Sequence, residues 1–278
     1  MEPTPFAAKL LRVPSTLKGA RLGSAHRYAI GRIKMAVDFN KVAKACEGRR
    51  FAGGVNELEE AHTALRARIE PHSSLPPEGD WGDPARVRPL ALALRQILLH
   101  RAIHLFEGTL DAVQAANPYM MILGMRGAFE TAAALGYLHQ RLTSSEDGNL
   151  DLKRVDEDIV AQVLGSRHPS LPEAMPAKQV LSMLEYADKS VSRHIMGGSS
   201  TEHAMLRNCY DFLCEFAHPN FHSNMLSYDL DGSARRLTFR YDKGMTDEAF
   251  GTLGYLLLAA SLHRDLHDAI DDVLPAVP

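Results

Sequence analysis

The chain has 278 residues, of which 45% are hydrophobic, and a net charge of −3. This length and composition suffice for one large domain, and the core needs no disulfides. The three cysteines are odd in number and show neither C-x-x-C nor zinc-ribbon spacing, so we expect a reducing, cytoplasmic setting. The longest apolar stretch, residues 249–262, is shorter than the ~20 residues that cross a bilayer, so no contact with a membrane is expected.

Charge is distributed unevenly along the chain. Residues 1–50 hold eleven Lys and Arg against three Asp and Glu, which predicts a basic N-terminal arm on an acidic body. The arm suits an extension folded on that body, a targeting peptide, or a contact with RNA or another nucleic acid through its phosphates. Met35 could even be the true first residue of the protein.

Residues 51–89 are expected to hold one helix and a linker. Asn56 can cap this helix, and Pro71 ends it. The linker that follows is rich in Pro and Gly and contains the only tryptophan, Trp81. From residue 90 the apolar spacing becomes helical, and we assign residues 90–278 to a helical bundle domain.

The second long helix of this domain is expected to begin at Asn117 and Pro118. Small and apolar residues surround it, which predicts a central, buried helix whose glycines and alanines let its neighbours approach closely. Arg126, Glu130 and Tyr137 form a single polar stripe on it. Because a buried arginine has five donors to satisfy, a second element should present partners to Arg126.

Two shorter helices are predicted near residues 154–165 and 177–195, and a capping box from Ser199 to Glu202 is expected to start the next one. Residues 225–241 alternate between apolar and polar about a turn and predict a β-hairpin. A last helix follows from Thr246. The fold class is therefore mainly α: an antiparallel helical bundle with one small β-hairpin inserted before the last helix.

The helix that precedes the hairpin carries a polar face. We expect four residues to face the core and four to lie opposite: Met205, Cys209, Phe212 and Phe216 against Arg207, Asp211, Cys214 and His218. Pro219 disfavours helical backbone at His218, so the helix should end there. In one interpretation His218 and Asn220 cap the helix and Arg207 pairs with Asp211 in solvent. In the other, His218 faces the stripe of Arg126 and forms a polar pocket with it.

These features resemble the HEPN-like helical domain superfamily of prokaryotes. The resemblance covers about residues 90–273 and consists of Arg-x-x-x-Glu on a central helix, here Arg126 and Glu130, and a later helix that ends in an acid and a His-Pro-polar corner, here Glu215, His218 and Asn220. It implies a cytoplasmic accessory or defence protein, usually dimeric, that binds RNA or cleaves it as a metal-independent endoribonuclease without a cofactor.

The same resemblance implies roles for individual residues. His218 would act as acid or base, Arg126 would contact phosphate, and Glu130 would orient that arginine. Three further residues would line the binding site: Tyr137, Arg207 and Asn220. Active members of the superfamily use an Arg-x(4-6)-His motif, whereas ten residues separate Arg207 from His218. This departure counts against catalysis.

Two other classes of function fit the sequence. The first is a non-catalytic helical interaction module, in which the polar pocket fixes helix packing and the arm or the hairpin edge binds a partner. The second is a metal-binding helical bundle. Two histidine pairs with one-turn spacing, His100 with His104 and His263 with His267, would have to lie on adjacent helices to form such a site. The simpler expectation is no metal, with these residues on a solvated face or at the border of the core.

Overall fold

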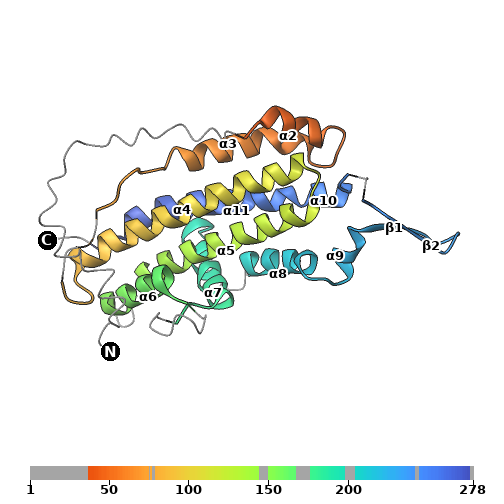
Figure 1. Ribbon diagram of the computed structural model, residues 1–278. Helices are drawn as coiled ribbons and strands as arrows, with labels where there is room; N and C mark the ends of the chain where they lie inside the picture. Colours follow the sequence, from red (N-terminus) through yellow and green to blue (C-terminus); the bar gives the residue numbers. More distant parts are fainter. Residues whose placement is uncertain are drawn as a thin grey trace, which may run out of the picture.

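The computed structural model describes residues 37–74, 76, 79–143, 150–166, 176–197, 204–241 and 244–275. The first 36 residues of the predicted basic arm lie outside this part of the chain, as does the predicted capping box at Ser199 and Glu202. The described residues form an antiparallel helical bundle with one small β-hairpin before the last helix, which confirms the predicted fold class (Figure 1).

Three long helices form the frame of the bundle. Helix α4 (Pro84–Gln114) runs towards the hairpin end, and α5 (Pro118–Thr143) and α11 (Leu253–Val273) run back (Figure 1). The shorter helices, in chain order, are α2 (Phe39–Cys46), the 3-10 turn η2 (Ala52–Gly54), α3 (Val55–Arg66), α6 (Leu152–Leu164), α7 (Val180–Ser190) with its π-helical extension η3 (Val191–Ile195), α8 (Met205–Ala217), α9 (Phe221–Met225) and α10 (Asp247–Gly251).

Helix α5 is the centre of the bundle, as its composition predicts. It packs against α4, α7, α8 and α11, and most of its side chains are buried. Small residues allow this close packing. A Cβ atom at Gly136 would lie 2.6 Å from the Cβ atom of Ala187 on α7, and one at Gly124 would lie 2.2 Å from Thr109 Oγ1 on α4. A larger residue at either glycine would therefore push two helices apart.

Local capping explains several helix boundaries. Asn117 Oδ1 accepts a hydrogen bond from the Met120 N–H (3.1 Å), which confirms the predicted start of α5. Asp83 caps α4, so this helix begins six residues before the predicted position. The predicted cap at Asn56 is wrong, because the turn η2 leads directly into α3 and places Asn56 inside the helix.

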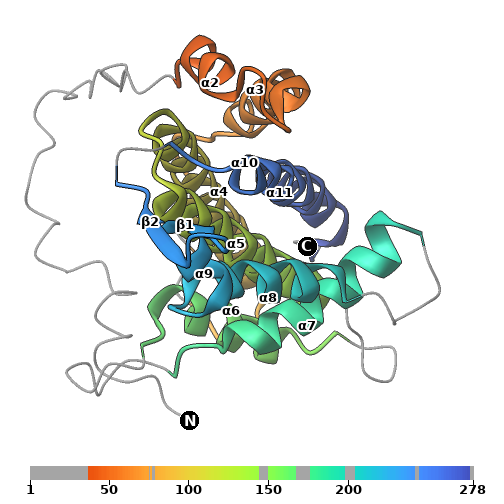
Figure 2. The same cartoon turned by 90° about the vertical axis from the view of Figure 1, so that its right-hand side faces the viewer.

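Helices α2 and α3 lie along one side of the bundle, over α4 and α11 (Figures 1 and 2). Their buried residues Val42, Leu58 and Leu65 join the hydrophobic core of the long helices. We assigned residues 39–50 to the basic arm and residues 51–66 to the next segment. In the structure residues 39–66 pack as part of the bundle.

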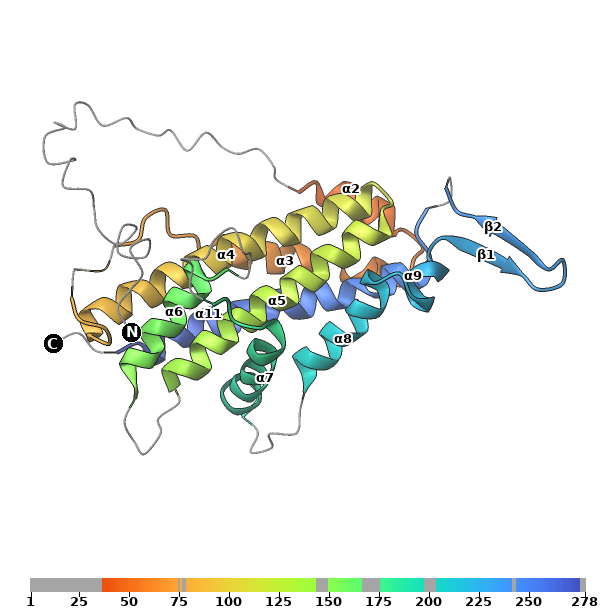
Figure 3. The same ribbon diagram turned by 60° about the horizontal axis from the view of Figure 1, so that its bottom comes forward.

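The hairpin consists of β1 (Tyr228–Asp231) and β2 (Arg236–Phe239), paired antiparallel as predicted. In its register Tyr228 lies opposite Phe239, and Leu230 lies opposite Leu237. The hairpin projects beyond the end of the bundle (Figure 3). Among the described helices, none has both the length and the hydropathy required to span a bilayer.

Candidate functional site

The polar stripe of α5 meets α8, which supplies the partner that Arg126 needs. Arg126 Nη2 donates a hydrogen bond to Tyr210 Oη at 2.9 Å, and the guanidinium carbon lies 5.2 Å from the centre of the Tyr210 ring. Arg126 Nε lies 3.4 Å from Glu130 Oε1, and Tyr210 Oη donates to the same carboxylate oxygen at 3.4 Å. Burial raises the pKa of Tyr210, so its hydroxyl stays protonated and bridges the two charged groups.

Helix α4 adds a second arginine to this cluster. Arg101 Nε donates to Thr131 Oγ1 at 3.0 Å, and Arg101 Nη2 lies 3.8 Å from Glu130 Oε2. The side chain of Arg101 is 56% exposed, so its guanidinium group borders solvent. Two guanidinium groups around one carboxylate leave a positive charge at a half-open site, which suits an anion.

His218 does not join this cluster. The backbone leaves the helical conformation at His218 (φ −90°, ψ 151°), as Pro219 predicts. The side chain is exposed and makes no hydrogen bond or ion pair with any described residue. Tyr210, the residue that faces the arginine, precedes His218 by eight positions, or about 12 Å along a helix. The expected pairing of His218 with Arg126 and Glu130 is therefore not present.

Tyr137 serves a separate, buried cluster at the other end of α5. Its hydroxyl donates to Asp158 Oδ2 of α6 at 2.8 Å, and Arg141 Nε lies 2.7 Å from the same oxygen. Lys178 also pairs with Asp158. Tyr137 lies eleven positions after Arg126, about 16 Å along the helix, so the predicted stripe contributes to two clusters and not to a single pocket.

The two remaining predicted site residues have local partners. Arg207 Nε donates to Asp211 Oδ2 at 2.7 Å on the exposed side of α8. The amide of Asn220 donates to Glu215 Oε2 at 2.8 Å, and its side-chain oxygen caps α9. The ion pair of Arg207 matches the simpler of the two sequence interpretations. Asn220 differs from it, because its side chain caps the start of α9 and not the end of α8.

The face of α8 that enters the core differs from the predicted one. Leu206, Tyr210 and Leu213 are buried, whereas Phe212, predicted to lie in the core, is partly exposed. Of the predicted stripe only Phe216 is buried. Residues 206, 210 and 213 form an equally regular apolar stripe, and this spacing is the signal that could have identified Tyr210.

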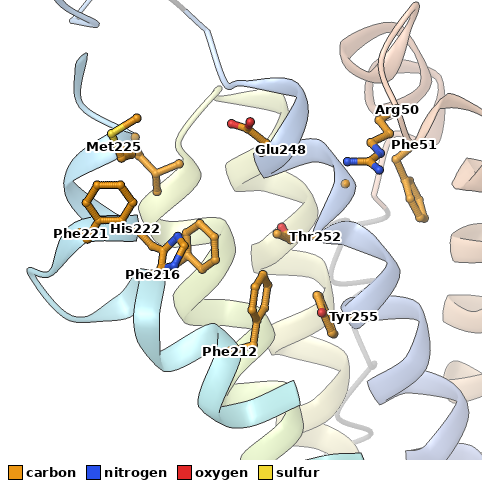
Figure 4. A pocket seen from close by; sticks show the side chains of 12 residues that line it. Arg50, Phe51, Phe212, Phe216, Phe221, His222, Met225, Glu248, Thr252 and Tyr255 are labelled. Carbon is orange, nitrogen blue, oxygen red and sulfur yellow. The ribbon is translucent and has the colours of Figure 1, made fainter. Parts of the chain in front are cut away.

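A second site was not predicted from the sequence. A groove of about 700 Å³ opens between α8 and α9 on one side and α10 and α11 on the other, near the turn that precedes α3 (Figure 4). We call it the aromatic groove. Its main aromatic and apolar lining consists of Phe51, Phe212, Phe216, Phe221, Met225 and Tyr255. Figure 4 shows Arg50 and Glu248 at its rim.

The histidine pairs do not form a metal site. Helices α4 and α11 do pack together, but His100 and His104 lie on the exposed side of α4 while His263 and His267 are buried on α11. Within the described residues, no three or more His, Cys, Asp or Glu side chains are arranged to hold a metal ion.

Comparisons with models of protein families, with curated proteins and with solved structures give no significant match to this chain. The class of this protein is therefore defined by its fold and its sites. It is a mainly α bundle that carries a projecting hairpin, an aromatic groove and a half-open Arg–Glu–Tyr cluster. The resemblance to HEPN-like domains rests on the sequence motifs.

Proposed function

We propose that this protein is a non-catalytic helical interaction module whose protein partner binds at the hairpin end. The observation that carries this proposal is an uncovered apolar face on the hairpin. Residues directly opposite in an antiparallel pair share one face, and so do residues two apart in a strand. One face of the hairpin therefore carries Tyr228, Leu230, Leu237, Phe239 and, by continuing the alternation, Tyr241. We call this set the hairpin apolar face.

This face is open to solvent. Leu230 is 65% exposed, Phe239 58% and Tyr241 91%. The opposite face is polar, and its Asp229 and Arg240 form an ion pair. Antiparallel sheets with such clean alternation normally bury the apolar face, and an isolated two-stranded hairpin is only marginally stable in water. The sequence of the hairpin therefore suits a strand pair that a partner covers.

The surroundings of His218 favour a binding function over a catalytic one. A general base must lie within about 2.6–3.2 Å of the group from which it takes a proton, and a second group usually holds it in position. No described residue orients the His218 side chain, and the arginine cluster lies further back along α8.

Site-specific photo-crosslinking tests the proposed function. With a benzoylphenylalanine in place of Tyr241, irradiation of cells that produce the full chain should give a discrete cross-linked product. The matched control carries the same group in place of Ile97, which is also exposed but lies on α4. Leu230→Asp should abolish the product at position 241. No product at this position, or equal products at both, would contradict the proposal.

RNA binding of the HEPN-like kind is a second candidate, and the convergence of Arg101 and Arg126 on Glu130 favours it. Phosphate oxygens could reach the exposed guanidinium group of Arg101, and the basic residues at the N-terminus would add sequence-independent attraction. The acidic balance of residues 51–278 opposes this attraction, which is why we rank it second.

Fluorescence anisotropy with single-stranded RNA at low and physiological salt tests this candidate. Arg101→Ala should weaken binding and reduce its salt dependence, whereas Arg207→Ala, which removes an arginine already paired with Asp211, should change little. In the same samples, His218→Ala should slow the cleavage of structured RNA if the protein is a ribonuclease. Equal inactivity of both proteins would remove the enzymatic role.

A further inference from the structure

Two uncovered apolar surfaces lie at the same end of the molecule. One is the hairpin apolar face. The other is the aromatic groove, where Phe212, Phe221 and Met225 remain partly or largely exposed. Helix α9 connects them, because Phe221 and Met225 line the groove and β1 begins at Tyr228. A partner bound at this end would therefore cover both surfaces.

A hairpin cannot fill the groove of its own chain. Leu226 forms part of the groove wall, and β1 starts two residues later, a distance that the chain spans in at most ~7 Å. The hairpin then points away from the bundle (Figures 1 and 3). A hairpin that occupies the groove must therefore come from another molecule.

We infer that this other molecule is a second copy of the chain, and that the hairpin of each copy docks in the aromatic groove of the other. The inference rests on the proposed function and names its partner. Such an exchange is two-fold symmetric, so both hairpins and both grooves are covered at once and no open surface is left for further growth.

The charges of the two surfaces are complementary. The groove rim holds one charge of each sign, Arg50 and Glu248, and neither has an ion-pair partner among the described residues. The hairpin tip also carries both signs, with Asp231 at the end of β1 and Arg236 at the start of β2. The exposed Arg236 likewise has no ion-pair partner among the described residues. Asp231 and Arg236 belong to the polar face of the hairpin, but they lie at its tip, where a long arginine side chain can reach the rim of the groove. Docking can therefore pair Arg236 of one copy with Glu248 of the other.

The exposed area is sufficient for a stable contact. An aromatic side chain buries about 150–250 Å² when it is covered. Phe221, Phe239 and Tyr241, together with Leu230 and Leu237, are each about half exposed or more. Their exposed surface amounts to several hundred Å² per copy. In a symmetric dimer both copies contribute this area, and the groove surfaces that are covered add to it. The total buried area therefore approaches the ~1,200–2,000 Å² of specific interfaces.

Sedimentation velocity of the full chain at micromolar concentration tests the inference. We expect a species of twice the 30.6 kDa chain mass. Leu230→Asp on the hairpin and Phe212→Asp in the groove should each raise the dissociation constant at least tenfold. Glu248→Arg and Arg236→Glu should each weaken the dimer, and the double variant should recover most of the loss. This recovery separates a lost contact from a damaged fold, which circular dichroism of each variant also checks.

A mixing experiment distinguishes docking in the groove from hairpin-to-hairpin packing. A Leu230→Asp chain retains a normal groove, and a Phe212→Asp chain retains a normal hairpin. Their mixture can form one intact hairpin-in-groove contact, so it should associate more tightly than either variant alone. Direct packing of two hairpins predicts no such recovery, and that result would overturn the inference.

Other outcomes separate this inference from the proposed function. A monomeric wild-type chain that still cross-links from position 241 to a different protein would overturn the second copy as partner and leave the interaction module standing. A monomeric chain without any cross-link would overturn both. A dimer that neither Leu230→Asp nor Phe212→Asp weakens would overturn the docking and locate the interface elsewhere.

Discussion

Tyr210 on α8 joins both members of the Arg126–Glu130 pair on α5 through one hydroxyl group, which accepts from the arginine at 2.9 Å and donates to the glutamate at 3.4 Å. The ring of the same residue lies against the guanidinium group. A single side chain thus links two helices by a hydrogen-bond bridge and a cation–π contact, and it supplies one hydrogen-bond partner to an arginine that is mostly withdrawn from water.

Tyr210→Phe should lower the free energy of unfolding by about 1 kcal/mol, because the ring stays while Arg126 and Glu130 lose a hydrogen-bond partner. Partial solvent access to both charged groups keeps the loss small. Urea unfolding would measure it. Tyr255→Phe is the matched control, because no described residue forms a hydrogen bond with the Tyr255 hydroxyl, and it should change the free energy by less than ~0.5 kcal/mol. Equal losses from both variants would show that the bridge contributes nothing.

Asp188 caps the start of α8 from a different helix. Its carboxylate accepts hydrogen bonds from the N–H groups of Leu206 (2.7 Å) and Arg207 (3.1 Å), although Asp188 itself belongs to α7. Asp188→Ala should cost about 1–2 kcal/mol, the usual effect of losing a helix cap, and hydrogen exchange should quicken first at the amides of residues 206 and 207. Asp151→Ala, which removes the more exposed cap of α6, should quicken exchange at Arg154 and leave α8 unchanged.

The fold class was predictable because its signals are local. Helical spacing, the cap at Asn117 and the alternation on either side of the hairpin turn each need only a few neighbouring residues. The need of Arg126 for a second partner also followed from its five donors and its apolar surroundings. The cap by Asp188 could not be predicted, because it depends on how α7 and α8 meet in space.

The identity of the site residues was less predictable for a physical reason. Helix α8 carries two apolar stripes of similar regularity, and one sequence cannot tell which stripe enters the core. We predicted that the stripe ending in Phe216 enters the core. With that orientation Tyr210 would face away from Arg126, and His218 would face towards it. The hairpin presents a different problem. Alternation along its strands predicts an apolar face, but it does not say whether the same chain covers that face.

Removing the carboxylate of Asp158, in the buried cluster at the far end of α5, should strongly destabilise the protein. Asp158→Ala leaves the buried guanidinium group of Arg141 without its ion-pair partner and the Tyr137 hydroxyl without its acceptor. We expect a loss of about 3–5 kcal/mol in the free energy of unfolding. The control Asp211→Ala removes an exposed ion pair with Arg207 and should cost less than ~1 kcal/mol. Similar losses from the two variants would contradict the buried role of Asp158.

His263 should make the protein sensitive to acid. It is fully buried on α11, its ring nitrogens lack a hydrogen-bond partner among the described residues, and burial, with a smaller effect from His267, lowers its pKa to about 3. An unfolded histidine has a pKa of about 6.5, so below that pH the unfolded chain binds a proton that the folded chain excludes. Stability is therefore complete above about pH 6.5 and falls as the pH drops towards 3, by at most ~1.4 kcal/mol per pH unit.

His263→Leu should remove this contribution, because leucine fills a similar volume and does not titrate. Near pH 7.5 the variant should match or exceed the wild type, and its advantage should grow to about 2–3 kcal/mol near pH 4.5. His104→Leu, at an exposed position, is the control for the effect of a histidine-to-leucine substitution itself. The buried His139, whose pKa burial and the neighbouring His194 lower to about 4, keeps part of the acid sensitivity in every variant. Unfolding curves that stay parallel for wild type and His263→Leu from pH 7.5 to 4.5 would show that His263 is protonated equally in the folded and unfolded chains.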